Sequence, residues 1–387
     1  MEKIPYARQS ISDDDIQAVV KVLQSDWLTQ GPVIERFEKA VADYCGAKYA
    51  VAVNSATSAL HIACLAAALG PGDTLWTSPN TFVASANCGL YCGADVDFVD
   101  IEERTYNISV LALDLKLKKT CQTGKLPQIV VPVHFSGQAC EMESIRKLTS
   151  PYGITLIEDA SHAIGGKYKD NPVGGCSFSD MTVFSFHPVK IITTGEGGMI
   201  TTNRQDLYER LILLRSHGIT RQDELMTEKS HGPWYYQQLD LGYNYRITDV
   251  QAALGFSQLK RIDNFVKRRH EIAARYNEKL AGLPLVLPWQ SPDTFSAYHL
   301  YVVKLELEKL TKTHRQIFSE LRENGIGVNL HYIPVHTQPY YRRYGFKAGD
   351  FPTAEAYYER AISLPMYYDL SEAEQDRVIT VIKGILQ

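Results

Sequence analysis

The alternation of short apolar segments with helical patterns over the first two hundred residues constrains this fold most. Residues 49–53, 73–77, 95–99, 129–133 and 154–157 read as strands, and residues 182–186 and 199–202 as a last strand pair. Helical spacing of apolar residues separates several of them, as at 57–69. Such alternation predicts an α/β fold with a mostly parallel sheet covered on both faces. Right-handed crossovers then place the carboxyl ends of the strands along one crevice.

The chain is long enough for a large domain with a smaller partner, because 387 residues exceed the roughly 150 of a typical domain. Residues 219–246 are polar and aromatic, and the length and composition of 219–236 allow a mobile lid. One long helical pattern follows from Thr248 to about Leu280, and then strands (300–305) and helices (314–324, 353–361) mix. We expect a large domain over residues 1–255 and a smaller α+β domain over 256–387.

Charge and cysteine usage exclude several classes of protein. The net charge is −4, from 40 basic and 44 acidic residues, with no long basic run, so no nucleic-acid partner is expected. Seven scattered cysteines without a C-x-x-C pair argue against a zinc or disulfide framework, and no metal site is expected. No apolar signal core or membrane-length segment is visible, which predicts a cytoplasmic protein with no membrane partner.

A small hydroxylated segment follows the first strand. Residues 54–58, Asn-Ser-Ala-Thr-Ser, lead directly into a helical pattern, whose first N–H groups would be free to bind an anion. By itself the segment also reads as an ordinary helix N-cap. No G-x-G-x-x-G follows the first strand and no P-loop motif occurs, which disfavours a dinucleotide or P-loop site.

Two carboxylates end the strand expected at 154–157. Glu158 and Asp159 are adjacent, so their side chains point to opposite faces and one of them can face the crevice. A carboxylate there can hold a ring nitrogen in its protonated form. The alternative is a second helix cap.

A single lysine follows the later strand. Lys190 ends the segment Phe-Ser-Phe-His-Pro-Val-Lys and precedes the glycine-rich Thr-Thr-Gly-Glu-Gly-Gly. An amine in such an apolar setting has a lowered pKa, which suits imine chemistry, although a lysine on a hairpin loop is the alternative. The three features together match what pyridoxal 5′-phosphate (PLP) requires. The 54–58 segment offers a phosphate site, the acid at the strand end offers a partner for the pyridine nitrogen, and the lysine offers an imine-forming amine.

These motifs resemble those of the DegT/DnrJ/StrS sugar aminotransferases over nearly the whole chain. The matching segments are 54–60, 158–163, 184–190, 194–198 and 242–255. Within the family, the chain is most similar to the transaminases of pseudaminic acid biosynthesis. The segments behind that closer likeness are 4–6, 27–32, 186–188, 215–218 and 331–334.

The resemblance implies a fold-type I homodimer with active sites shared between subunits. It makes Lys190 the catalytic lysine, which holds PLP as an internal aldimine, and Asp159 the partner of the pyridine nitrogen. It places His162 near the ring hydroxyl and Phe82 against the ring face. The implied phosphate-binding and cross-subunit positions are Ala56, Thr57, Ser185 and, from the neighbouring subunit, Asn244.

The resemblance also assigns a sugar-nucleotide site. Its positions are Tyr6, Asp26, Trp27, Leu28, Thr29, Ala56, Ser185, Asn244, Asn329, Leu330, His331 and Tyr332. From the residues alone, His331 would be a loop residue and His187 a residue that shapes the turn before Lys190. The implied reaction moves an amino group from glutamate to C4 of a UDP-4-keto-6-deoxy-N-acetyl-hexosamine, and the favoured acceptor is the pseudaminic acid precursor.

The sequence also allows two other functions. One is an aminotransferase for a different 4-keto nucleotide sugar, of the bacillosamine or perosamine type. The other, from a different class, is a non-catalytic sugar-nucleotide-binding protein on the same fold. Some relatives lack the lysine and are dehydratases, but Lys190 is present here, so transamination is the expectation.

Overall fold

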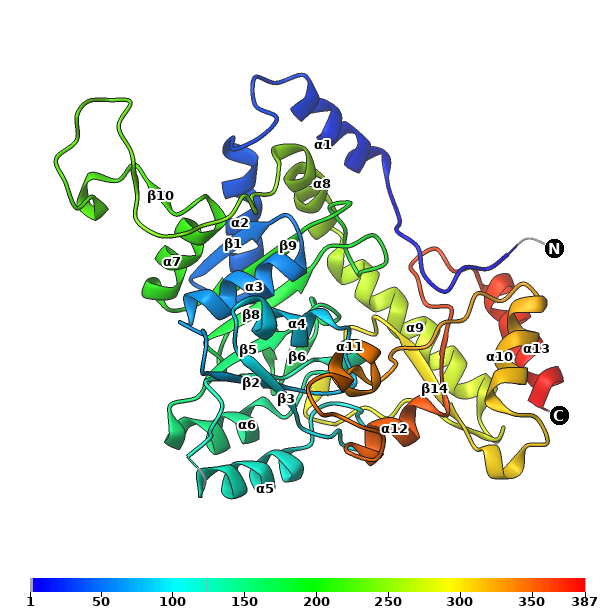
Figure 1. Cartoon of the computed structure of the whole chain (residues 1–387). Coiled ribbons are helices and arrows are strands. Elements are labelled where there is room, and N and C mark those ends of the chain that lie inside the picture. The colour runs from blue at the N-terminus through cyan, green and yellow to red at the C-terminus, as the bar shows by residue number, and fades with distance from the viewer. Residues whose placement is uncertain (1–2, 123, 387) are drawn as a thin grey trace.

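A seven-stranded mixed sheet forms the centre of the molecule (Figure 1). The computed structural model describes residues 3–122 and 124–386. The strands, in spatial order, are β1 (Tyr49–Val53), β9 (Gly198–Thr202), β8 (Met181–Ser185), β5 (Thr155–Asp159), β4 (Ile129–Val131), β2 (Thr74–Thr77) and β3 (Asp95–Phe98). From β8 to β3 neighbouring strands run parallel, whereas β9 is antiparallel to both β8 and β1. The predicted α/β class and the predicted pairing of the last two strands are confirmed.

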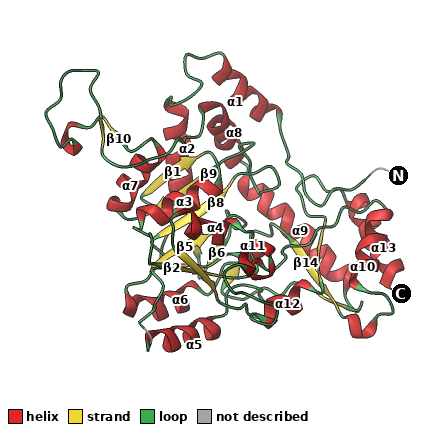
Figure 2. Cartoon of the chain, in the orientation of Figure 1, coloured by secondary structure: helices red, strands yellow, loops and turns green. Residues whose placement is uncertain are grey.

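Helices cover both faces of this sheet (Figure 2). Alternate residues of one strand enter two different apolar cores: Ala50 and Ala52 of β1 lie in one, Val51 and Val53 in the other. The first core is closed mainly by α2 (Pro32–Cys45), α5 (Val110–Cys121) and α6 (Met142–Thr149). The second is closed mainly by α3 (Ala56–Ala66), α4 (Ala84–Tyr91) and α7 (Gln205–Arg215). The strands are apolar on both sides because both sides are buried.

The long helix expected from residue 248 to residue 280 is two helices, so that expectation was wrong. Thr248 caps α8 (Asp249–Leu259), and α9 (Ile262–Leu280) begins after Arg261, whose backbone leaves the helical region at φ −109° and ψ 4°. The Arg261 side chain binds Asp15 of α1 (Asp13–Leu23) and the carbonyl of Ser10. The break lets α8 pack on α1 and α2 while α9 continues to the carboxyl-terminal region.

A second sheet organises the carboxyl-terminal region. It holds β12 (Leu285–Val286), β14 (Tyr301–Leu305) and β15 (Ala361–Leu364), and it packs with α9, α10 (His314–Glu323) and α13 (Glu372–Leu386) around a separate core. The helix expected to reach residue 361 ends earlier, as α12 (Pro352–Tyr358), because Ala361 already pairs with Lys304 of β14. Ile4 of the amino-terminal segment joins this core and bridges Ile326. The domain boundary at residue 255 stays a prediction.

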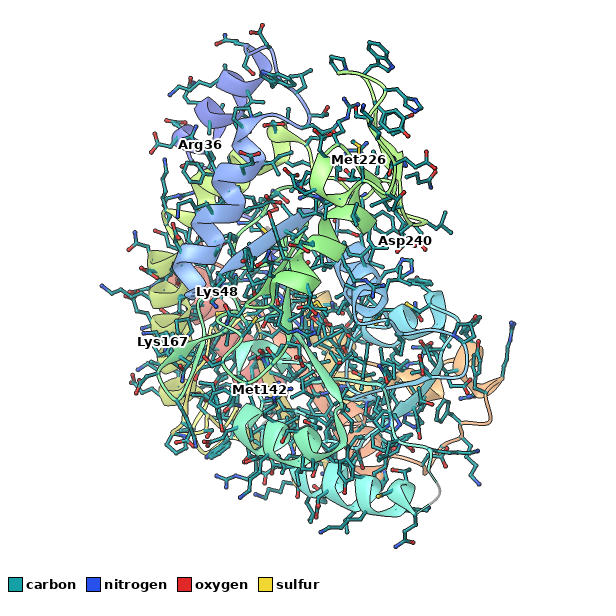
Figure 3. The ribbon with its side chains drawn as sticks, turned by 90° about the vertical axis from the view of Figure 1, so that its left-hand side faces the viewer. Arg36, Lys48, Met142, Lys167, Met226 and Asp240 are labelled. Atoms are coloured by element: carbon teal, nitrogen blue, oxygen red, sulfur yellow. The ribbon has the colours of Figure 1, made fainter. Side chains whose placement is uncertain are left out.

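Shorter elements complete the described chain. They are β6 (Lys167–Tyr168), β7 (Asn171–Pro172), β10 (Ile219–Thr220), β11 (Gln237–Gln238), β13 (Thr294–Phe295) and α11 (Pro339–Arg342), with five short 3-10 turns. The β10–β11 pair closes the 221–236 loop, which extends away from the body of the molecule in Figure 1 and carries Met226 in Figure 3. Within residues 3–122 and 124–386, no helix has both the length and the apolar character needed to cross a membrane.

Candidate active site

The turn after β8 presents Lys190. The backbone N–H of Lys190 donates to the carbonyl of His187 at 2.9 Å, and Thr194 closes the segment by donating to Phe186 at 3.0 Å. Desolvation lowers the pKa of the Lys190 amine to about 8, although the nearby Asp159 carboxylate opposes the shift. The side chain stays partly exposed. Lys190 is therefore an amine that gives up its proton more readily than an ordinary lysine and remains within reach of a ligand.

Asp159 is the last residue of β5 and is buried. Its Oδ2 accepts from the Ser85 hydroxyl at 2.6 Å, and its Oδ1 accepts from the Ser161 backbone N–H at 3.0 Å. Ser85 is itself hydrogen-bonded to Thr81 at 2.7 Å. These partners fix the orientation of the carboxylate. Ser85 was not predicted from the sequence, because a serine in the first turn of a short helix looks like any other residue of that turn.

The phosphate cup forms where β1 runs into α3. Ser55 caps α3, and its hydroxyl accepts from the Ser58 backbone N–H at 3.1 Å, so the helix-cap interpretation also holds. The first N–H groups of the helix, at Ala56 and Thr57, have no partner within the helix. Gly198 lies against this turn, and a Cβ added there would come within 2.7 Å of the Ala56 nitrogen.

Ser185 joins the cup through the sheet. It pairs with Gly198 across β8 and β9, which places it beside the start of α3, and its hydroxyl accepts from the His187 backbone N–H at 3.4 Å. In the described chain, no hydrogen bond uses the Thr57 hydroxyl. Ser185 thus lies close to the free amino terminus of α3, an arrangement that suits a phosphate group.

A cluster of aromatic rings forms another part of the site. Phe82 is 59% exposed although it is large and apolar, and its ring lies 6.2 Å from that of Tyr332. The Tyr332 hydroxyl is 3.1 Å from Nε2 of the buried His162. The ring of His299 lies 4.4 Å from that of His162. His299 was not predicted from the sequence, because nothing local to residues 297–301 distinguishes it from other residues that precede a strand.

The segment 329–332 brings the carboxyl-terminal region to the same place. Asn329 Nδ2 lies 3.4 Å from His331 Nε2, and the ring of Tyr6 lies 5.7 Å from that of His331. Burial, followed by the charge of Lys190, lowers the pKa of His331 to about 3. The Tyr332 backbone N–H donates to Asn80 Oδ1 at 3.3 Å, which ties this segment to the large sheet. Leu330 is partly exposed beside Asn329. The predicted sugar-nucleotide residues of this segment therefore lie next to the predicted cofactor residues.

The remaining predicted residues lie on the surface. Asp26, Trp27, Leu28 and Thr29 are exposed, and Thr29 bridges Thr248. The Asn244 side chain is exposed and has no hydrogen-bond partner in residues 3–122 and 124–386, although its carbonyl accepts from Asn54 Nδ2 at 3.5 Å. The structure does not bring these positions into contact with Lys190 within one chain.

The residues present fit PLP. The buried carboxylate of Asp159 could pair with a pyridinium nitrogen, and the Lys190 amine of lowered pKa lies near it. The free start of α3, against which Gly198 leaves no room for a side chain, suits the phosphate. The exposed face of Phe82 suits the flat ring.

Comparison with known proteins shows the family of this chain. The model of the DegT/DnrJ/EryC1/StrS aminotransferase family matches residues 9–383. The spore coat polysaccharide biosynthesis protein SpsC of Bacillus subtilis is 41% identical, with 99% of this chain and 97% of SpsC covered.

Two solved structures share the fold. Helicobacter pylori PseC, an aminotransferase involved in the biosynthesis of pseudaminic acid, superposes with a TM-score of 0.90 at 30% identity, covering 100% of this chain and 99% of PseC. Spr1654 from Streptococcus pneumoniae in its PLP-form gives a TM-score of 0.88 at 29% identity and covers 100% of both chains. This chain therefore belongs to the DegT/DnrJ/EryC1/StrS family and is a PLP-dependent sugar aminotransferase.

Proposed function

We propose that this enzyme transfers the amino group of glutamate to C4 of a UDP-4-keto-6-deoxy-N-acetyl-hexosamine in the cytoplasm. The proposed acceptor is UDP-2-acetamido-2,6-dideoxy-β-L-arabino-hexos-4-ulose, a precursor of pseudaminic acid. The observation that carries the proposal is the contact between Tyr332 and His162, which joins the 329–332 segment to the residues around Lys190. The likeness to PseC over the whole chain supports the choice of sugar.

The chemistry divides between the cofactor and the chain. When bound, PLP supplies the electron sink that makes the amino-bearing carbon of the donor acidic. The Lys190 amine takes the proton from that carbon, and later delivers a proton to C4 of the sugar. Its pKa of about 8 keeps both the acidic and the basic form populated near neutral pH. Asp159, held by Ser85 and Ser161, keeps a negative charge available to the ring nitrogen.

Asn244 and the exposed loop at 26–29 support a homodimer with shared active sites. Both lie on the surface of one chain, where a second copy can reach them. The test mixes two inactive variants, Lys190→Ala and Asn244→Ala. If each site uses Lys190 from one subunit and Asn244 from the other, mixed dimers contain one intact site and regain activity. If both residues serve the same subunit, mixing restores nothing.

A second acceptor is favoured by a separate observation. SpsC, at 41% identity, is named for spore coat polysaccharide biosynthesis, so another 4-keto nucleotide sugar, of the bacillosamine or perosamine type, is the alternative. A non-catalytic sugar-nucleotide-binding protein is disfavoured, because such a protein has no use for a lysine of lowered pKa beside Asp159.

A product assay separates the two acceptors. The enzyme, PLP and glutamate are mixed with the UDP-4-keto-6-deoxy sugar of either the N-acetyl-altrosamine or the N-acetyl-glucosamine series, and the amino sugar is followed by mass spectrometry. Amine formed only from the first supports the proposed acceptor. Amine formed only from the second keeps the reaction type and overturns the proposed sugar.

A further inference from the structure

His162 has a hydrogen-bond partner at each ring nitrogen, and together they determine where its proton lies. The Ser136 backbone N–H donates to Nδ1 at 3.2 Å. An N–H group cannot donate to a nitrogen that carries its own proton, so Nδ1 is bare and the neutral ring carries its proton on Nε2. Burial and the charge of Lys190 hold the pKa of His162 well below its ordinary value, which agrees with a neutral ring.

The direction of the next hydrogen bond follows. Nε2 of His162 and the Tyr332 hydroxyl are 3.1 Å apart. Because Nε2 carries the proton, His162 donates and the Tyr332 oxygen accepts. The hydroxyl proton of Tyr332 is then directed elsewhere, and no acceptor for it occurs among residues 3–122 and 124–386. Burial raises the pKa of Tyr332, and Asp159 and Tyr6 raise it further, so the hydroxyl stays protonated.

The surroundings hold this chain of groups in place. The His162 ring packs against His299 at 4.4 Å, and Ser136 is tied to the Leu300 carbonyl through its hydroxyl at 2.7 Å. Tyr332 lies beside Phe82, whose exposed face borders the cofactor site. The free donor of Tyr332 therefore belongs to the site that holds the ligands.

We propose that Ser136 and His162 act as positioning residues that force the Tyr332 hydroxyl to donate to an oxygen of a bound ligand. The acceptor is an oxyanion or carbonyl oxygen, on either the cofactor or a substrate. His162 then acts through Tyr332, which differs from the direct contact with the ring hydroxyl that the family resemblance implied. The inference rests on the cofactor site and is independent of which sugar is the acceptor.

Nitrogen-15 NMR spectroscopy tests the direction of the His162–Tyr332 hydrogen bond without any substrate. In apoenzyme labelled with ¹⁵N-histidine, His162 is assigned by loss of its signals in His162→Gln. We expect the Nε2–H form with no change of protonation between pH 5.5 and pH 8, a range chosen to bracket the ordinary histidine pKa of about 6.5. A proton on Nδ1 overturns the proposal.

Two substitutions of His162, whose side chains have the same shape as each other, test whether the direction of its hydrogen bond to Tyr332 affects ligand binding. His162→Gln can accept from Ser136 with its oxygen and donate to Tyr332 with its nitrogen, so it preserves the direction. His162→Glu has no donor when ionised, so the Tyr332 hydroxyl turns towards it. We expect His162→Glu and Tyr332→Phe each to weaken ligand binding or the donor half-reaction by about 10- to 100-fold, and His162→Gln to lose clearly less than His162→Glu, because it keeps the direction of the hydrogen bonds.

The affinity or KM that changes in these variants identifies the molecule that carries the acceptor oxygen. A lower affinity of the apoenzyme for PLP places it on the cofactor, whereas a higher KM for glutamate or for the sugar at unchanged PLP affinity places it on that substrate. Tyr276→Phe controls for general destabilisation, because it removes a buried hydroxyl that donates to the Pro365 carbonyl in the core of the carboxyl-terminal region. Equal behaviour of His162→Gln and His162→Glu, with both folded by circular dichroism, overturns the proposal. Because PLP affinity and the glutamate half-reaction need no sugar, failure of the proposed acceptor does not affect this test.

Discussion

Two histidines near the end of β5 have the same hydrogen-bonding pattern on one ring nitrogen and different partners on the other. His134 Nδ1 accepts from the Cys140 backbone N–H at 3.1 Å, as His162 Nδ1 accepts from Ser136. His134 Nε2 then donates at 2.6 Å to Glu158, a carboxylate that only accepts. His162 Nε2 donates to Tyr332, which still has a proton to give. The first series of hydrogen bonds ends inside the protein, and the second continues into the ligand site.

The same contrast separates the two adjacent acids of β5. Glu158 also accepts from the hydroxyls of Ser179 and Thr182. Burial raises the pKa of Glu158, but the bond with His134, followed by the bonds with these two hydroxyls, holds it below its ordinary value. Asp159 points the other way and lies near Lys190 and Tyr332. We infer that the Glu158 side of the strand serves stability and the Asp159 side serves catalysis. Substitutions on the two sides should therefore differ in what they change.

The largest effect is expected on the catalytic side, from Lys190→Ala. Without the amine no group is placed to move the proton, so turnover should fall by at least about 10⁴-fold, while pyridoxamine phosphate still binds. Steady-state turnover and cofactor titration measure the two properties. Lys39→Ala, which removes an exposed lysine, is the control and should keep full activity. Full activity of Lys190→Ala would remove the lysine from the mechanism.

The next largest loss of turnover is expected from Asp159→Asn. It keeps the shape and removes the charge that the pyridine nitrogen needs, so turnover should fall by about 10³-fold with the fold intact. Stopped-flow measurement of the glutamate half-reaction isolates this step from sugar binding. A loss below tenfold would mean that another acid performs the role assigned to Asp159.

Sequence patterns pointed to these two residues because Asp159 ends a strand and Lys190 lies in the turn after another, and the alternating fold places strand ends at one crevice. Partners that come from elsewhere in the chain were not predictable in this way. Ser85 reaches Asp159 from α4, and His299 reaches His162 from the segment before β14. The break between α8 and α9 was missed for the same reason, since it depends on the contact between Arg261 and Asp15.

The stability side is tested by Glu158→Gln. The new amide places a donor among the three donors of His134, Ser179 and Thr182, so the free energy of unfolding should fall by about 3 kcal/mol. Turnover of the protein that remains folded should change by less than threefold, or about 0.7 kcal/mol. Urea unfolding and turnover at low temperature measure these separately. Glu143→Gln, at an exposed ion pair, controls for loss of a surface charge. A loss of turnover as large as that of Asp159→Asn would refute the division between the two sides.

The last effect expected is a dependence of apoenzyme stability on pH. The pKa of Lys190 is about 8 in the folded chain and near its ordinary 10.5 when unfolded, so between these values the unfolded state binds more protons. Stability therefore rises with pH across this window, and below pH 8 the full penalty of a desolvated ammonium is present. Lys190→Met removes the penalty, so it should be more stable than the wild type at pH 7 and lose that advantage as the pH approaches 10.5. Because other groups titrate in both proteins, the difference between their urea midpoints isolates Lys190. A difference that does not change with pH would show that the amine is as well solvated in the folded chain as in the unfolded one, and the catalytic side would then lack the reactive lysine that distinguishes it from the Glu158 side.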